Sequence, residues 1–220
     1  MESNINFQLK MDRKLEEISK DIEAGGRIPT LLLHGCCAPC SSYVLEYLNR
    51  YFSITSFYYN PNISEEKEYR KRVDELGRLI QELPVLNEVS MIEGRYDTSE
   101  FDTAINGMEE LGEGSRRCYA CYELRLRETA KTAAEKGFDY FTTTLSISPY
   151  KNAKWLNEIG KCLEQEYGVE YLFADFKKRN GYKRSIELSQ EYNLYRQDYC
   201  GCKYSKEENE KKKHIKNVDI

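Results

Sequence analysis

The sequence has no long apolar segment and no recognisable targeting segment at its start. No apolar run approaches the ~20 residues that a membrane-spanning helix needs, and the mean hydropathy is −0.73. Residues 1–10 lack the basic and apolar regions of a secretory signal. We therefore expect a cytoplasmic protein without membrane association, in a compartment where thiols stay reduced and a disulfide framework is the weaker explanation for its cysteines.

The net charge and the positions of glycine give little support to two further classes of protein. Thirty-seven acidic and 33 basic residues give a net charge of −4, so the average charge alone does not indicate a nucleic-acid partner. An ATP-dependent tRNA-modifying enzyme of similar topology would need a glycine- and serine-containing phosphate loop after the first predicted strand, but Gly35 is followed by cysteines. No internal repeat is visible, and 220 residues suffice for one domain with a real core.

Basic residues are nevertheless grouped along the chain. Each group could be a solvated helix face or part of an RNA-binding surface. We expect Arg116 and Arg117, together with Lys177, Lys178 and Arg179, to rim one cleft and contact phosphates. The three groups are Lys67, Arg70, Lys71 and Arg72; Arg116, Arg117, Arg125 and Arg127; and Lys177, Lys178, Arg179, Lys183 and Arg184.

Apolar runs of strand length alternate with helical patterns, which predicts an α/β fold with a parallel sheet covered on both faces. Helices are predicted before and between the strands, among them Met11–Ala24 and Arg116–Lys136, the second of which ends at Gly137. A ligand should bind at the loops that follow the carboxyl ends of the strands. The Lys- and Glu-rich end of the chain is predicted to be disordered. The expected strands are Ile28–His34, Ser53–Tyr59, Glu88–Ile92, Tyr140–Thr144 and Glu170–Ala174.

Seven of the eight cysteines form three tight clusters, and only Cys162 stands alone. Grouped thiolates repel one another unless a metal or a disulfide uses them, so this spacing indicates metal or redox chemistry. The clusters are Cys36, Cys37 and Cys40; Cys118 and Cys121; and Cys200 and Cys202.

The first cluster follows the first predicted strand. Pro39 suits a first helical position, which places Cys40 in the first turn and Cys37 just before it, near the positive end of the helix dipole. Because adjacent side chains point in different directions, we expect Cys36 and Cys37 to serve two metal atoms rather than one ion.

The other two clusters extend this interpretation. Cys118 and Cys121 are three residues apart at a predicted helix start and share a face. Four thiolates could hold a structural zinc ion, but a position at the ligand-binding edge of the sheet favours an iron–sulfur cluster. Cys200 and Cys202 flank a glycine and could form a labile disulfide, act as spare metal ligands or stay reduced.

Five segments of the sequence carry recognisable motifs. They are His34–Cys40, Tyr59–Ile63, Arg117–Cys121, Thr143–Lys151 and Tyr199–Cys202. Together they resemble the motifs of the cobalamin-independent epoxyqueuosine reductases. The resemblance runs from about Ile28 to Tyr204, with residues 1–27 as an additional helix, 28–204 as the reductase domain and 205–220 as a charged tail.

This resemblance implies a HUP-like five-stranded α/β domain with a cysteine-bearing C-terminal segment. It also implies the last step of queuosine synthesis, in which the epoxide of epoxyqueuosine at the tRNA wobble position is reduced to the alkene. The implied ligands of a [4Fe-4S] cluster are Cys36, Cys37, Cys118 and Cys121, with Cys40 as the candidate ligand of an additional iron. Cys200 and Cys202 would be the redox-active disulfide.

The expected partners are the anticodon loop of a tRNA that contains epoxyqueuosine and an unidentified electron donor. The rival interpretation is a zinc-binding module that contacts RNA without redox catalysis. We interpret His34 as a core residue rather than a ligand. The candidate substrate-binding residues are Tyr59, Asn60, Arg117, Ser146, Tyr150 and Lys151.

Overall fold

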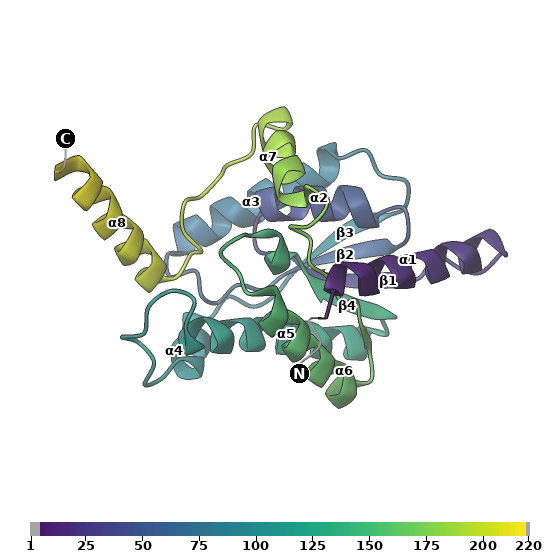
Figure 1. Cartoon of the computed structure of the whole chain (residues 1–220), viewed down its shortest axis with the longest axis horizontal. Helices are drawn as coiled ribbons and strands as arrows, with labels where there is room; N and C mark the ends of the chain where they lie inside the picture. The colour runs from purple at the N-terminus through teal and green to yellow at the C-terminus, as the bar shows by residue number, and fades with distance from the viewer. Residues whose placement is uncertain (1–4, 219–220) are drawn as a thin grey trace.

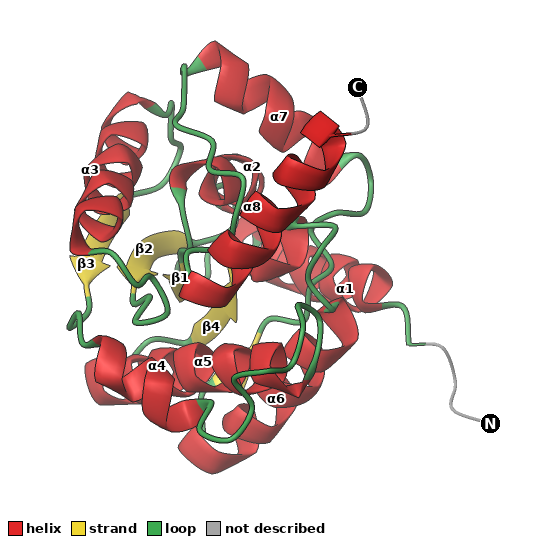
Figure 2. Ribbon diagram, turned by 90° about the vertical axis from the view of Figure 1, so that its left-hand side faces the viewer, coloured by secondary structure: helices red, strands yellow, loops and turns green. Residues whose placement is uncertain are grey.

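The computed structural model describes residues 5–218, which form a five-stranded parallel sheet between two layers of helices (Figures 1 and 2). The strand order is β3-β2-β1-β4-β5. The elements are α1 (Phe7–Glu23), β1 (Thr30–His34), α2 (Ala38–Leu48), β2 (Ser53–Tyr58), α3 (Glu66–Glu82), β3 (Val89–Glu93), α4 (Thr98–Ala104), α5 (Arg116–Lys136), β4 (Tyr140–Thr143), the 3₁₀ helix η1 (Thr144–Ile147), α6 (Ala153–Tyr167), β5 (Glu170–Tyr171), α7 (Gly181–Glu191) and α8 (Lys203–Val218).

Two hydrophobic cores cover the two faces of the sheet. Successive side chains of a strand point to opposite faces, so Leu31 and Leu33 of β1 pack with α1, α2 and α3. Leu32 points the other way and packs with α5 and α6. This continuous apolar strand is typical of a parallel sheet buried on both sides, and the predicted α/β class is confirmed.

The strand order reverses between β1 and β4. From β1 the chain proceeds outward through β2 and β3, then returns to the other side of β1 to form β4 and β5. His34 and Thr143 are paired at the carboxyl ends of β1 and β4. Loops that leave such a point part in opposite directions, which opens a crevice there. The first cysteine cluster follows His34 directly.

All five predicted strands are present, but the fifth is shorter than expected because it ends at Tyr171 instead of Ala174. The amide side chain of Asn157 on α6 accepts from the Ala174 N–H and donates to its carbonyl, both at 2.9 Å. A side chain therefore satisfies the backbone groups that a neighbouring strand would otherwise use.

The end of the chain differs from the prediction of disorder, since residues Lys203–Val218 form α8. Glu208 binds Arg117 at 3.1 Å, and Lys203 binds Asp102 at 3.3 Å. Figure 2 shows α8 crossing in front of the sheet, and Figure 1 shows its far end projecting from the body. Composition predicted a solvated segment, but the contacts at the start of α8 dock it on the domain.

Helix α1 begins at Phe7, earlier than the predicted Met11, because Asn6 caps it by accepting from the Leu9 N–H at 3.1 Å. Met11 and Leu15 are buried in the core that they share with β1. Within residues 5–218, no helix has both the length and the apolar character needed to cross a membrane.

Candidate metal centre and substrate cavity

The first cysteine cluster is a compact group of three thiols at the start of α2. The Sγ atoms of Cys36, Cys37 and Cys40 all lie within 4.8 Å of one another. Cys37 is the N-cap residue of α2 and has an extended backbone, with φ −175° and ψ 163°. Pro39 lies in the first turn of the helix, as predicted. The expectation that Cys36 and Cys37 diverge is wrong, because their sulfurs are 3.9 Å apart. The extended N-cap lets both face the thiol that Cys40 presents from the first turn.

The three thiols differ in acidity. Hydrogen bonds from Cys37 and Cys40, and a further one from Thr144, hold the pKa of Cys36 well below its usual range. The hydrogen bond to Cys36, together with burial, raises the pKa of Cys37 to about 12. Hydrogen bonds to Cys36 and Cys37 raise the pKa of Cys40 as well. In the metal-free cluster, two thiols therefore donate hydrogen bonds to one thiolate. Binding a soft metal would release the remaining protons.

Thr144 is a residue that the sequence interpretation did not single out. Its hydroxyl accepts from the Cys36 N–H at 3.3 Å and donates to the Cys36 sulfur at 3.5 Å. It follows β4 directly, and its side chain therefore reaches across the switch point to the loop after β1. The pair Thr143-Thr144 at the end of a buried strand was the available signal.

His34 is a satisfied core residue, as the sequence suggested. It is fully buried, with Nδ1 2.9 Å from the Thr143 hydroxyl and Nε2 3.1 Å from the Tyr59 carbonyl. Burial, together with the nearby charge of Arg125, lowers its pKa to about 4. The neutral ring thus links the ends of β1, β2 and β4.

The second cluster lies at the start of α5, which spans the residues predicted for it. Ser115 caps the helix by accepting from the Arg117 N–H at 3.3 Å. Cys118 is buried in the core against which Cys36 packs, and its sulfur accepts from the Gly114 N–H at 3.4 Å. Cys121 belongs to a small apolar cluster with Cys202. The start of α5 therefore lies between the other two cysteine segments.

The third cluster is held by the start of α8. The Sγ atoms of Cys200 and Cys202 are 3.4 Å apart as free thiols, so the disulfide stays a prediction. Gly201 has φ +112°, a conformation that favours glycine. A hydrogen bond from Cys202, supported by the charge of Lys151, holds the pKa of Cys200 well below its usual range.

One guanidinium faces all three clusters. Arg125 is 3% exposed, and its Nε donates to the Cys121 carbonyl at 3.1 Å. Although burial opposes its charge, Cys121, Cys36 and Cys200 raise its pKa. Within the described residues no carboxylate pairs with it. The sequence had placed Arg125 in a basic surface group; it is instead a buried charge that offsets thiolates.

Four of the cysteines, Cys36, Cys37, Cys40 and Cys200, line a cavity of about 470 Å³, which lies within the range of ~300–1,000 Å³ of small-molecule sites. Cys118, Cys121 and Cys202 are not among its lining residues. Its wall is strongly cationic, and a buried Arg72 adds a hydrogen bond to the Cys200 carbonyl at 3.3 Å. The chemically reactive lining residues are Cys36, Cys37, Cys40, Cys200, Arg72, Arg125 and Lys151.

Four of the six predicted substrate residues are buried and bound to the protein itself. The Tyr59 hydroxyl donates to Glu100, and the Asn60 amide donates to the Gly35 carbonyl at 2.9 Å. Ser146 accepts from the Phe176 N–H at 3.3 Å, and Arg117 binds Glu208 as described above. None of these four residues is among those that line the cavity, and direct contact with substrate stays a prediction for them.

The other two predicted substrate residues, Tyr150 and Lys151, line the cavity. Tyr150 is 76% exposed, whereas the Lys151 side chain is only 9% exposed and lies 3.6 Å from a Glu113 carboxylate oxygen. Burial opposes the Lys151 charge, but Cys200 and Tyr122 raise its pKa. Lys151 is therefore a fixed positive charge inside the cavity.

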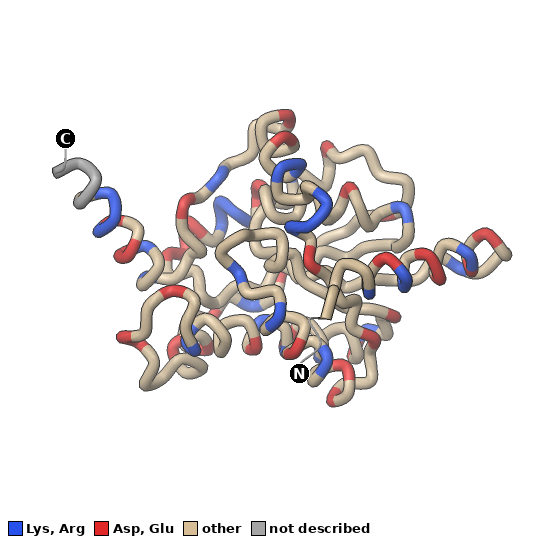
Figure 3. The backbone as a smooth tube through the Cα atoms, viewed as in Figure 1, with Lys and Arg blue, Asp and Glu red and all other residues tan. Residues whose placement is uncertain are grey.

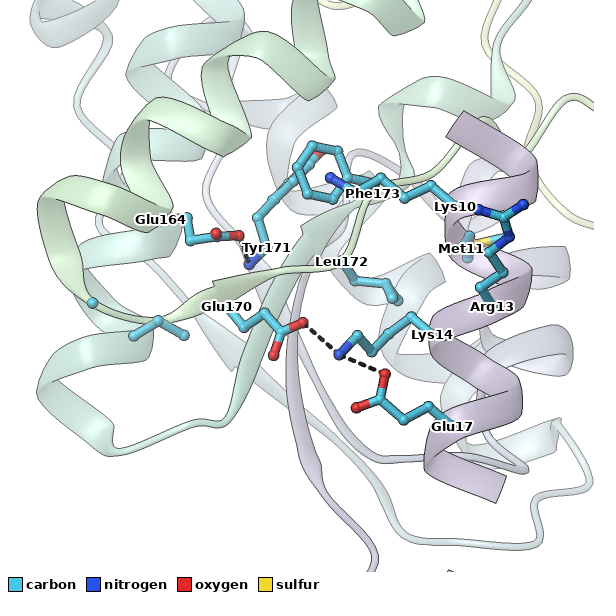
Figure 4. A pocket seen from close by; sticks show the side chains of 12 residues that line it. Lys10, Met11, Arg13, Lys14, Glu17, Glu164, Glu170, Tyr171, Leu172 and Phe173 are labelled. Carbon is cyan, nitrogen blue, oxygen red and sulfur yellow. Dashed lines mark hydrogen bonds and ion pairs between the residues drawn. The ribbon is translucent and has the colours of Figure 1, made fainter. Parts of the chain in front are cut away.

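A second hollow, of about 550 Å³, lies between α1 and β5 and contains none of the cysteines. Figure 4 shows Lys14 at its centre, paired with Glu17 at 3.1 Å and Glu170 at 3.0 Å. The charge of Lys14 is therefore offset within this hollow.

Comparisons with known proteins agree on one family. The family model described as epoxyqueuosine reductase QueH matches residues 31–208. The Epoxyqueuosine reductase QueH of Streptococcus pyogenes is 41% identical over 204 residues, covering 92% of this chain and 80% of that protein. The one from Thermotoga maritima is 37% identical over 182 residues, covering 80% of this chain and 90% of its own.

Among solved structures, the U34-tRNA thiolase NcsA from Methanococcus maripaludis, determined with its [4Fe-4S] cluster, shares the fold. It aligns with a TM-score of 0.52 and 14% identity, covering 90% of this chain and 68% of the thiolase. The match to the family model over most of the sequence, and relatives well above 30% identity, show that this chain belongs to the epoxyqueuosine reductase QueH family.

Proposed function

We propose that the protein reduces the epoxide of epoxyqueuosine, at the wobble position of tRNA, to the alkene of queuosine. The observation that carries this proposal is the three-thiol group of Cys36, Cys37 and Cys40 at the topological switch point of a chain from this family. We propose tRNA as its partner and the cytoplasm as its location.

Cys36, Cys37, Cys118 and Cys121 are the proposed ligands of a [4Fe-4S] cluster, and Cys40 is the candidate ligand of an additional iron. Thiolates are the usual ligands of such clusters. The site fits an anionic centre, because Arg125 and Arg72 are buried beside the sulfurs and the Arg125 charge has no carboxylate partner in residues 5–218. When bound, the centre would supply electrons and a Lewis-acidic iron.

The overall reaction requires two electrons and two protons. Both C–O bonds of the epoxide break, a C=C bond forms, and the oxygen leaves as water. Negative charge develops on that oxygen as the bonds break, and a positive cavity wall stabilises it. Lys151 suits this role because its raised pKa keeps the ammonium protonated.

Cys200 and Cys202 are the proposed relay. Oxidation of the Cys200 thiolate and the Cys202 thiol to a disulfide releases two electrons and one proton. The two electrons match the demand of the epoxide, and the second proton that the epoxide oxygen needs is taken from water. The depressed pKa of Cys200 and the raised pKa of Cys202 make one a thiolate and keep the other protonated. An external electron donor would then reduce the disulfide again.

The test is anaerobic turnover of tRNA that contains epoxyqueuosine, followed by nucleoside analysis. The reconstituted wild-type protein should form queuosine with dithionite as reductant. Cys200→Ser should keep its iron and lose turnover with a protein donor, whereas Cys162→Ser, an exposed cysteine on α6, should behave as wild type. A colourless zinc protein without turnover would instead support the RNA-binding module.

A further inference from the structure

Three segments that are far apart in the sequence form the mouth of the cysteine-lined cavity. Tyr150 follows η1, Arg196 lies between α7 and α8, and Lys212 lies on α8. All three side chains are exposed, and Tyr150 is the most exposed aromatic ring among the described large apolar residues. We call these residues the cavity rim.

The cavity rim carries positive charge that the described residues do not neutralise. Arg196 donates to two neutral acceptors, the Ser189 hydroxyl at 2.8 Å and the Ser185 carbonyl at 3.5 Å. Lys212 has no side-chain partner among the described side chains of residues 5–214. The two acids that line the same cavity are already engaged, Glu113 with Lys151 and Asp198 with Lys213.

Most residues of the basic groups recognised in the sequence are paired with acids. Figure 3 shows Lys and Arg positions mixed with Asp and Glu over the whole backbone, including α1 and α8. Carboxylates pair with Arg70, Arg72, Arg117, Arg127, Lys177, Arg179, Lys183 and Arg184. Cations held by neighbouring acids are poor phosphate ligands. Lys67, Lys71, Arg116 and Lys178 also have no carboxylate partner among the described side chains, but unlike Arg196 and Lys212 they do not line the cavity.

We propose that Arg196 and Lys212 bind backbone phosphates of the substrate RNA beside the nucleotide that enters the cavity, and that Tyr150 stacks on an adjacent base. This inference rests on the proposed function, which supplies RNA as the ligand. Phosphate contacts position a nucleic acid, while an exposed ring offers a stacking platform to any unpaired base. Lys212 lies beyond residue 208, where the family match ends, so the family match does not include this contact.

The test measures binding of tRNA that contains epoxyqueuosine, over a range of salt concentrations. For a single-stranded site, each lost phosphate contact lowers the slope of log K against log salt by ~0.7. Arg196→Gln and Lys212→Gln should each show this change and weaken binding by about fourfold at 0.15 M salt. Lys211→Gln is the matched control, because Lys211 neighbours Lys212 on α8 but does not line the cavity.

Tyr150 has its own pair of variants. Tyr150→Ala should weaken binding about fivefold or more without changing the salt slope, and Tyr150→Phe should retain affinity because it keeps the ring. Iron content and thermal unfolding of each variant show whether the fold and the centre are intact.

Equal effects of Lys211→Gln and Lys212→Gln would overturn the proposal, since they would indicate diffuse charge rather than a contact. A second result would also overturn the proposal: rim variants that bind tRNA as wild type does, but turn over more slowly only when a protein supplies the electrons. That result would assign the rim to binding of the electron donor. The affinity measurement needs no turnover. Wild-type protein that binds this tRNA without forming queuosine would therefore contradict the proposed function and not the rim.

Discussion

Arg125 and Arg127 show what a residue's type alone does not reveal. They lie two positions apart on α5 and were grouped together in the sequence, yet Arg127 is exposed and bound to Glu166, while Arg125 is buried among sulfurs. Residues two apart on a helix point in different directions. Because basic and apolar residues occur on several sides of α5, the sequence alone does not show which of the two arginines faces inward.

His34 predicts a pH dependence of stability. Its pKa is about 4 in the folded protein, against about 6.5 when unfolded. Between these values the unfolded chain binds a proton that the folded one does not, so stability falls as the pH drops from 6.5 to 4, by up to about 3 kcal/mol. Urea unfolding of the metal-free protein across this range measures the loss. His34→Gln should flatten the profile, and an unchanged slope in this variant would assign the effect to other groups.

Thr144 predicts a change in thiol reactivity. Thr144→Val keeps the shape but removes the hydrogen bond to the Cys36 sulfur, which should raise the pKa of Cys36 towards its usual range. Alkylation of metal-free protein at several pH values, with the labelled residue located by mass spectrometry, measures this. Thr144→Ser should retain the wild-type profile. Identical profiles for the valine and serine variants would show that the hydroxyl does not stabilise the thiolate.

Element boundaries were predictable where local chemistry sets them. The span of α5 was predicted because Ser115 begins it and Gly137, at φ +71°, ends it. The early end of β5 was not predictable, since it depends on Asn157 of another element. Helix α8 was missed for the same reason: its docking partners, such as Arg117, are distant in the sequence.

The loop before α8 gives a prediction about glycine. In Gly201→Ala, the added Cβ would lie 2.7 Å from Cγ1 of Ile63, and φ +112° is unfavourable for alanine. We expect a loss of about 1–3 kcal/mol in the free energy of unfolding. Gly112→Ala is the control, because nothing lies within 4 Å of its Cβ position and no positive φ is involved. Equal stability of the two variants would contradict a strained turn at the cysteine pair.

The docking of α8 gives a second prediction at this scale. Glu208→Gln removes the carboxylate that faces the Arg117 guanidinium, whose side chain is 4% exposed, and should cost about 1–3 kcal/mol. Glu65→Gln breaks the exposed pair with Lys206 and should cost less than about 1 kcal/mol. Thermal unfolding compares them. A loss as small for Glu208→Gln as for Glu65→Gln would mean that this pair does not hold α8.

At the scale of the whole molecule, strand order brings the three cysteine segments together. The sequence predicted that thiols would gather at the carboxyl edge of the sheet, and Cys36, Cys37 and Cys40 do so. It did not predict Thr144 beside Cys36 or Arg125 between the clusters, because both contacts depend on how β1, β4 and α5 meet. The general location of the thiols could therefore be predicted from the local sequence, whereas the groups that compensate their charge could not.

The central claim is that thiolates from two separate segments hold one iron–sulfur centre. The direct measurement is iron and acid-labile sulfide per chain after anaerobic reconstitution, for wild type, Cys37→Ser, Cys121→Ser and the control Cys162→Ser. We predict at least about four iron and four sulfide in wild type and in Cys162→Ser, with clear losses in the other two variants. A single metal ion without sulfide, or a full complement in Cys121→Ser, would contradict the account.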